Sequence, residues 1–125
     1  MTKPVLVIDD SDDNLEIIRA KLTHVGYRIK TALDGETGLH MAREFSPGVI
    51  LCDIMLPRMD GWEVLSRLKA DPATKDIPVI LMTAYTTIQY QGERSRALEL
   101  GAAEYLKKPM DLNEMTRLVG EYLGR

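Results

Sequence analysis

The stretch VLVIDDSDDN, residues 5–14, joins a wholly apolar run to a cluster of acidic residues. The run VLVI (5–8) is short and rich in β-branched residues, which is typical of a strand buried on both faces of a parallel sheet. The acids that follow at once are Asp9, Asp10, Asp12 and Asp13. Like charges this close repel one another and are costly to desolvate, so the stretch predicts a buried strand that ends at a site which uses the charge.

The rest of the chain alternates between apolar runs and segments with helical periodicity. We expect further strands over 49–52 and 78–83, with weaker candidates at 27–32 and 103–106. The expected helices cover 14–25, 35–45, 61–70, 93–100 and 111–123, and most are bounded by glycine or proline. Asp111 and Glu114 match a capping box at the start of the last helix.

This alternation predicts an α/β fold, a (βα)5 doubly wound five-stranded parallel sheet with flavodoxin-like strand order 2-1-3-4-5. At 125 residues the chain fits one domain spanning 1–125, and we expect no effector domain. A formal charge of −3 gives no support for binding to nucleic acid or to an anionic membrane. The sequence contains one cysteine, Cys52, so an internal disulfide is impossible. The apolar N-terminal run is too short for a signal peptide, and we therefore expect a cytoplasmic protein.

In doubly wound sheets the ligand site lies beyond the carboxyl ends of the strands. The residues expected at that edge are Asp9, Asp10, Asp53, Thr83 and Lys108. Carboxylate ligands without aligned histidine or cysteine favour Mg²⁺ over Zn²⁺, and Mg²⁺ commonly pairs carboxylates with a phosphate oxygen. A hydroxyl and an ammonium could then bind the other phosphoryl oxygens, so the set predicts an Mg²⁺-assisted phosphoryl site.

Four segments resemble the signature segments of response-regulator receiver domains, the phospho-acceptor modules of two-component signalling. They are VLVIDD (5–10), VILCDIMLPRMDGWEV (49–64), PVILMTA (78–84) and GAAEYLKKP (101–109), in the order and near the spacing of that family. The resemblance implies a signalling phospho-acceptor rather than an enzyme in the usual sense, although such a domain catalyses its own phosphotransfer and a slow autodephosphorylation.

By this resemblance, Asp53 would accept the phosphoryl group from a histidine kinase or a histidine phosphotransfer protein. Asp9, Asp10, Asp53 and the main-chain carbonyl of Met55 would bind Mg²⁺. Lys108 would contact the phosphoryl oxygens, next to a Lys108–Pro109 bond that is typically cis in this family.

The resemblance also implies a switch. Thr83 would move toward the phosphoryl group and Tyr105 would swing inward behind it, which would reshape the face formed by the fourth helix, fifth strand and fifth helix for an unknown downstream partner. Met55 and Tyr85 occupy positions that influence autodephosphorylation in the family. Both are bulky and lack an acid or amide, so we expect a long-lived phosphoryl group.

Other residues have simpler interpretations. Asp12 and Asp13 suit the start of a helix, where acids are favoured by the free N–H groups and the dipole, and we expect this role ahead of metal binding. Trp62 suits packing. The segment 84–96 predicts an extended loop, a few residues longer than is usual for the family, that would alter partner contact or be a tolerated surface insertion.

Three competing functions make specific demands on the sequence. A Mg²⁺-dependent aspartyl phosphatase generally has D-x-D after a strand, whereas Met55 stands where the second acid would be. A flavin or nucleotide binder needs a glycine- or hydroxyl-rich anion loop after the first strand, where this chain has acids. A receiver that is never phosphorylated has no use for the intact set of Asp53, Thr83 and Lys108.

Overall fold

A computed structural model describes residues 3–84, 87–108 and 111–124 of the chain. The strands are β1 (Val5–Ile8), β2 (Ile29–Ala32), β3 (Val49–Asp53), β4 (Val79–Thr83) and β5 (Glu104–Lys107). The helices are α1 (Asp12–His24), α2 (Gly35–Phe45), α3 (Gly61–Ala70), α4 (Thr87–Glu99) and α5 (Leu112–Leu123).

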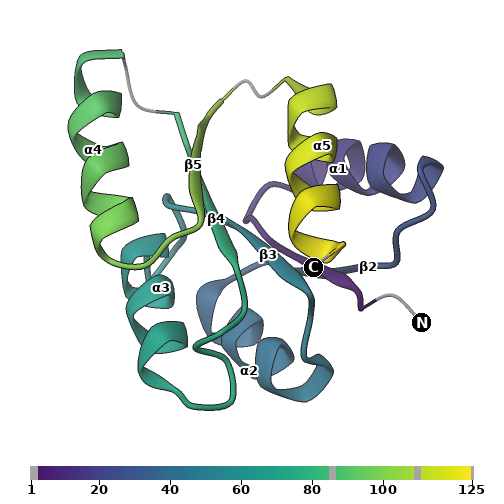
Figure 1. Cartoon of the computed structure of the whole chain (residues 1–125), viewed down its shortest axis with the longest axis horizontal. Helices are drawn as coiled ribbons and strands as arrows, with labels where there is room; N and C mark the ends of the chain where they lie inside the picture. The colour runs from purple at the N-terminus through teal and green to yellow at the C-terminus, as the bar shows by residue number, and fades with distance from the viewer. Residues whose placement is uncertain (1–2, 85–86, 109–110, 125) are drawn as a thin grey trace.

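The strands form one parallel sheet in the order β2-β1-β3-β4-β5, which confirms the predicted fold class and strand order. Helices α1 and α5 lie on one side of the sheet and α2, α3 and α4 on the other (Figure 1). Each crossover from one strand to the next carries a helix, as parallel pairing requires.

The three central strands are buried along their whole length, because alternate residues enter two separate apolar cores. In β1, Val5 and Val7 pack with α1 and α5, whereas Leu6 and Ile8 pack with α2 and α3. Gly38 of α2 allows this close packing, since a Cβ there would lie 2.4 Å from the Ile8 side chain. The continuous apolar runs of the sequence therefore reflect burial on both faces.

Helix α1 begins at Asp12, two residues before the predicted start at position 14. The helix begins after Ser11, whose side chain accepts a hydrogen bond from the Asn14 N–H at 3.2 Å. Asp12 and Asp13 then lie in the first turn, as expected for acids at a helix start.

The prediction of an extended loop over 84–96 was wrong for most of its length. Helix α4 begins at Thr87, six residues before the predicted start at 93. The segment TTIQYQG (86–92) lacks a clear apolar periodicity and contains Gly92, a poor helix former, so its sequence resembles a loop. Residues 85 and 86 lie outside the described part of the chain.

The remaining elements match their predicted positions within a residue or two. Asp111 caps α5 by accepting hydrogen bonds from the N–H groups of Asn113 and Glu114 at 2.9 and 3.3 Å. No helix within 3–84, 87–108 and 111–124 combines the length and apolar character that a bilayer crossing requires.

Candidate functional site

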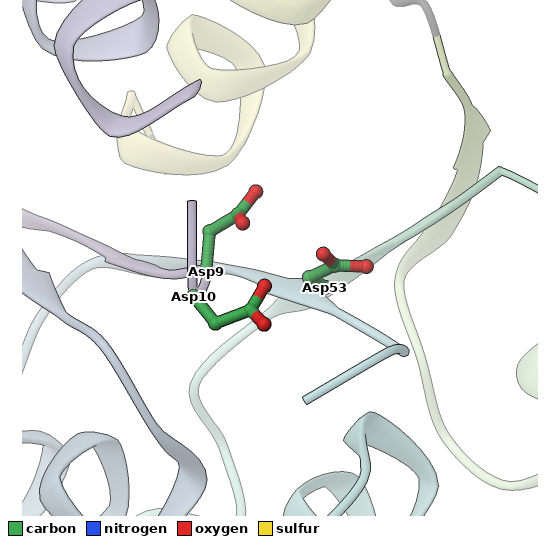
Figure 2. Close-up of side chains that lie close together, drawn as sticks. All are labelled: Asp9, Asp10 and Asp53. Carbon is green, nitrogen blue, oxygen red and sulfur yellow. The ribbon is translucent and has the colours of Figure 1, made fainter. Parts of the chain in front are cut away.

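Two neighbouring strands end in the acidic residues of the site. Asp53 is the last residue of β3, and Asp9 and Asp10 follow directly after β1, which pairs with β3 in register Ile8 to Cys52. The chain turns after Ile8, so Asp9 and Asp10 both reach the carboxyl edge of the sheet although an ideal strand would point them to opposite faces. The predicted convergence of these three residues is confirmed, with one carboxylate oxygen from each lying within 4.8 Å of the others (Figure 2).

The three carboxylates differ in their surroundings. Asp9 is 0% exposed and Asp53 is 5% exposed, whereas Asp10 faces solvent. Asp9 accepts the Ser11 N–H at 2.9 Å, and Asp53 accepts the Met55 N–H at 3.2 Å. Main-chain donors therefore hold the two buried carboxylates from behind, while Asp10 gives the cluster an open side.

Lys108 joins the two buried carboxylates. Its ammonium nitrogen lies 3.1 Å from Asp9 Oδ2 and 3.0 Å from Asp53 Oδ2. The Lys108 N–H donates to the Thr83 carbonyl at 2.6 Å, which fixes the residue just beyond the end of β5 against the end of β4. The structure therefore brings the predicted Lys108 to the carboxylates.

Charge at the site is not balanced by the protein groups alone. Burial raises the pKa of Asp53 and the nearby Asp9 raises it further, although the hydrogen bond and charge of Lys108 act in the opposite direction. Burial would lower the pKa of Lys108, but its contacts with Asp53 and Asp9 outweigh burial and raise that pKa. Among the described residues the cluster thus holds three carboxylates and one ammonium that contacts two of them, and an added cation would relieve the excess negative charge.

The donor set fits Mg²⁺ as the sequence predicted. All three side chains offer carboxylate oxygens, the hard ligands that Mg²⁺ prefers, and the exposed side at Asp10 leaves room for the waters that this ion keeps. The described residues offer no histidine or second kind of ligand in this cluster, and Asp12 and Asp13 are not part of it.

The β3–α3 connection fixes the position of Asp53. Gly61, the first residue of α3, donates its N–H to the Ile54 carbonyl at 2.8 Å. A Cβ at Gly61 would lie 2.6 Å from the Asp53 carbonyl oxygen and 2.7 Å from Ile54 Cα, both main-chain atoms that cannot easily move. Helix α3 therefore meets the end of β3 at a distance that only glycine permits.

The other predicted site residues surround this centre. Thr83 is fully buried at the end of β4, and Tyr105 is fully buried in β5, already inside the protein. The Met55 side chain is 59% exposed beside Asp53. Pro109 and Tyr85, which the family resemblance also singled out, lie outside the described residues.

Sequence reasoning missed two supporting residues. Ser11 both caps α1 and donates to Asp9, and Gly61 sets the approach of α3 to Asp53. A polar residue directly before a helix, and a glycine directly after the capping Asp60, were the available signals. Neither signal identifies the contact with the carboxylates, because that contact depends on how the elements pack.

Comparison with known proteins gives a consistent result. A family model described as the response regulator receiver domain matches residues 5–120. The response regulator PleD of Caulobacter vibrioides is 45% identical over 111 residues, which cover 89% of this chain and 24% of PleD. The chain thus spans about a quarter of that relative. The polar-differentiation response regulator DivK of Brucella ovis is 34% identical over 99% of this chain and 98% of its own length.

Solved structures agree in fold. The receiver domain of the Pseudomonas aeruginosa sensor histidine kinase PA1611, with a magnesium ion coordinated in its active-site cleft, has a TM-score of 0.86 and 29% identity, and the match covers both chains completely. The receiver domain of the Francisella response regulator 1452 has a TM-score of 0.88 and 28% identity over 98% of each chain.

Proposed function

The chain belongs to the response regulator receiver domain family, and from this premise we propose that Asp53 accepts a phosphoryl group from a phosphohistidine. The observation that carries the proposal is the ammonium of Lys108, which bridges Asp9 and Asp53 beside the exposed carboxylate of Asp10. A nucleophile, a compact positive charge and a set of hard oxygen ligands then surround one point.

The proposed reaction transfers a phosphoryl group from a histidine nitrogen of the donor to a carboxylate oxygen of Asp53. A carboxylate oxygen of Asp53 attacks the phosphorus, the phosphorus–nitrogen bond breaks, and its electron pair returns to the imidazole of the donor. Lys108 is already within hydrogen-bond distance of Asp53, so its ammonium can follow the new phosphoryl oxygens as charge develops. The Met55 N–H, now bonded to Asp53, steadies the nucleophile during attack.

Asp9, Asp10, Asp53 and the main-chain carbonyl of Met55 would hold the Mg²⁺ ion. When bound, Mg²⁺ neutralises the charge that otherwise opposes attack of one anion on another. Asp9 and Asp53 supply ligand atoms that main-chain donors already orient, and Asp10 supplies the ligand on the open side. The magnesium ion of the related PA1611 receiver domain supports this assignment.

The proposed output is a change at the face formed by α4, β5 and α5. Thr83 ends the strand beside Asp53, and Tyr105 lies in the next strand, with Thr83 opposite Lys107 and Leu81 opposite Tyr105. Movement of Thr83 toward a phosphoryl group, with repacking of the side chains around a Tyr105 ring that is already buried, would pass the signal to a downstream protein. The phosphoryl donor would be a cytoplasmic histidine kinase or phosphotransfer protein. This domain itself would have neither nucleic acid nor a membrane as a direct partner.

Phosphorylation by acetyl phosphate with and without Mg²⁺, read by intact-mass spectrometry, tests the proposal. We expect a phosphorylated species that requires both Mg²⁺ and Asp53, and Asp53→Asn should abolish it. A native protein that gains no phosphoryl group from acetyl phosphate and does not respond to beryllofluoride would overturn the proposal.

Two neighbouring acids provide a matched pair for the metal assignment. Asp10 and Asp13 are both exposed carboxylates, but only Asp10 belongs to the cluster. Asp10→Asn should raise the Mg²⁺ concentration that gives half-maximal phosphorylation by roughly tenfold or more, since a charged ligand is lost. Asp13→Asn should leave that concentration unchanged. Equal effects of the two substitutions would contradict the ligand assignment.

A further inference from the structure

Three side chains from three different elements stack against one another beside the site. The guanidinium carbon of Arg96 in α4 lies 4.3 Å from the centre of the Trp62 ring in α3. The Trp62 ring lies 6.0 Å from the ring of Tyr105 in β5, with 40° between the ring planes. Both separations fall within the ranges of favourable cation–π and aromatic contacts.

The stack runs from solvent into the core. Arg96 is exposed, Trp62 is half-buried and packs against the apolar cluster between the sheet and α2–α3, and Tyr105 is 0% exposed within that cluster. Trp62 therefore covers the buried tyrosine ring from its outer side. If Tyr105 turned outward, its ring would lose this contact. If Trp62 were displaced, Tyr105 could turn outward more easily.

The main chain beside Trp62 is packed against the end of β3. Trp62 follows Gly61, whose N–H donates to the Ile54 carbonyl at 2.8 Å and where a Cβ would lie 2.6 Å from the Asp53 carbonyl oxygen. The indole is thus fixed from the β3 side by its backbone and from the α4 side by the Arg96 guanidinium. The Trp62 ring therefore contacts both the Arg96 guanidinium and the Tyr105 ring.

We propose that Trp62, held in place by Arg96, is a positioning residue that keeps Tyr105 buried before any phosphoryl group reaches the site. The part of this inference that concerns signalling rests on the proposed function. In the native chain, burial of Tyr105 is then independent of phosphorylation, and the orientation of this ring is decided by the contact between α3 and α4. Weakening the contact makes burial of Tyr105 depend on the phosphoryl group.

The experiment measures exposure of Tyr105 in the protein without Mg²⁺ or phosphoryl donor. Incorporated 3-fluorotyrosine gives one fluorine signal for each of the five tyrosines, and Tyr105→Phe assigns the one of interest. Relaxation by a soluble paramagnetic chelate then reports solvent access. Trp62 is the only tryptophan, so acrylamide quenching of fluorescence reports the outer half of the stack separately.

We expect Tyr105 to be protected in the native protein. Arg96→Gln should lower the ratio of buried to exposed Tyr105 by about two- to fivefold, the range that a cation–π contact at an exposed site supplies. Acrylamide quenching of Trp62 should rise in the same variant. Arg96→Lys, which keeps the cation, should fall between native protein and Arg96→Gln.

Two further variants separate the ring contact from simple charge effects. Arg96 also lies 3.7 Å from Glu93, so Glu93→Gln removes that ion pair and leaves the stack. Arg67→Gln removes a similar exposed arginine from α3, one that pairs with Glu63. Both should behave as the native protein. Tyr105 that is exposed in the native protein, or equally protected in Arg96→Gln, would overturn the proposal.

Beryllofluoride with Mg²⁺ provides a second measurement on the same samples. It should restore protection of Tyr105 in Arg96→Gln and change little in the native protein. If exposure increases in Arg96→Gln but beryllofluoride has no effect on either protein, the positioning role stands and the proposed phospho-acceptor function fails. If beryllofluoride binds but native Tyr105 becomes protected only then, the positioning role fails and the proposed function stands.

Discussion

Burial and the neighbouring Asp9 raise the pKa of the Asp53 carboxyl group in the folded protein. A carboxyl whose pKa is higher in the folded than in the unfolded chain binds more protons when folded. Folding stability therefore falls as the pH rises from about 4, the ordinary carboxyl value, through the folded pKa. At neutral pH the charge on Asp53 destabilises the metal-free protein.

Asp53→Asn should consequently stabilise the metal-free protein at pH 7 and raise its Tm. The advantage should shrink as the pH is lowered through the acidic range, where Asp53 itself becomes protonated. Thermal unfolding in a chelator at several pH values measures both effects. Asp13→Asn serves as control and should be slightly destabilising, since it removes an acid from the first turn of α1. An Asp53→Asn variant that is less stable than native protein at pH 7 would contradict this account.

We expect Met55 to affect how long a phosphoryl group on Asp53 would last. Its side chain is 59% exposed, directly beside the nucleophile, and contains no group able to orient an attacking water. Met55→Asn should accelerate decay of the phosphorylated protein by about three- to tenfold, the equivalent of one net hydrogen bond. Loss of radiolabelled phosphate over time measures this rate. Unchanged decay in Met55→Asn, or native decay that is already faster than in the variant, would contradict the prediction.

At the scale of elements, docking of α3 against the end of β3 determines where Asp53 lies. Gly61→Ala places a methyl group within 2.6 Å of the Asp53 carbonyl oxygen, so the two elements must separate. We expect a loss of about 2 kcal/mol or more in unfolding free energy and slower phosphorylation by acetyl phosphate. Urea denaturation and intact-mass kinetics measure the two effects.

Gly92 in α4 is the matched control for that substitution. It also lies within a helix, but a Cβ there would have nothing within 4 Å. Gly92→Ala should therefore stabilise the protein by about 0.5–1 kcal/mol through helix propensity alone. If both glycine substitutions changed stability in the same direction, close approach of α3 to Asp53 would not be the reason for Gly61.

Helices α2, α3 and α4 show what the sequence could and could not predict. The bounds of α2 and α3 were predicted correctly because glycine and proline punctuate both ends and apolar residues recur at helical spacing. The start of α4 was missed because Gly92 and the polar residues before it resemble a loop. Tertiary contacts such as Arg94 with Glu104 at 3.1 Å tie this helix to β5, and no local pattern reveals them.

At the scale of the whole molecule, the topology explains why the site itself was predictable. In a parallel sheet every strand ends at the same edge, so residues distant in sequence, such as Asp9, Asp53 and Lys108, had to meet once the strand ends were located. The Arg96–Trp62–Tyr105 stack was not predictable in this way. It depends on how far α3 and α4 lie from each other, which the sequence pattern does not determine.

The excess of negative charge at this edge links cation binding to the stability of the entire fold. Mg²⁺ that binds the folded chain and not the unfolded one should raise stability by about 1.4 kcal/mol at ten times its Kd, or roughly 5 °C in Tm. The increase should nearly vanish in Asp10→Asn and Asp53→Asn, which each remove a charged oxygen ligand from the cluster. Because Mg²⁺ also relieves the repulsion between Asp9 and Asp53, the advantage of Asp53→Asn over native protein should narrow or reverse when the ion is added.

Differential scanning calorimetry with increasing MgCl₂ measures this linkage, and NaCl at matched ionic strength controls for screening of surface charge. Screening acts on every exposed carboxylate of the molecule, whereas the proposed site requires the ligands of Asp9, Asp10 and Asp53 together. Equal stabilisation by the two salts, or an Mg²⁺ effect that persists in both variants, would mean that the carboxylate cluster does not bind the ion. The proposed phosphoryl chemistry would then lose its cation.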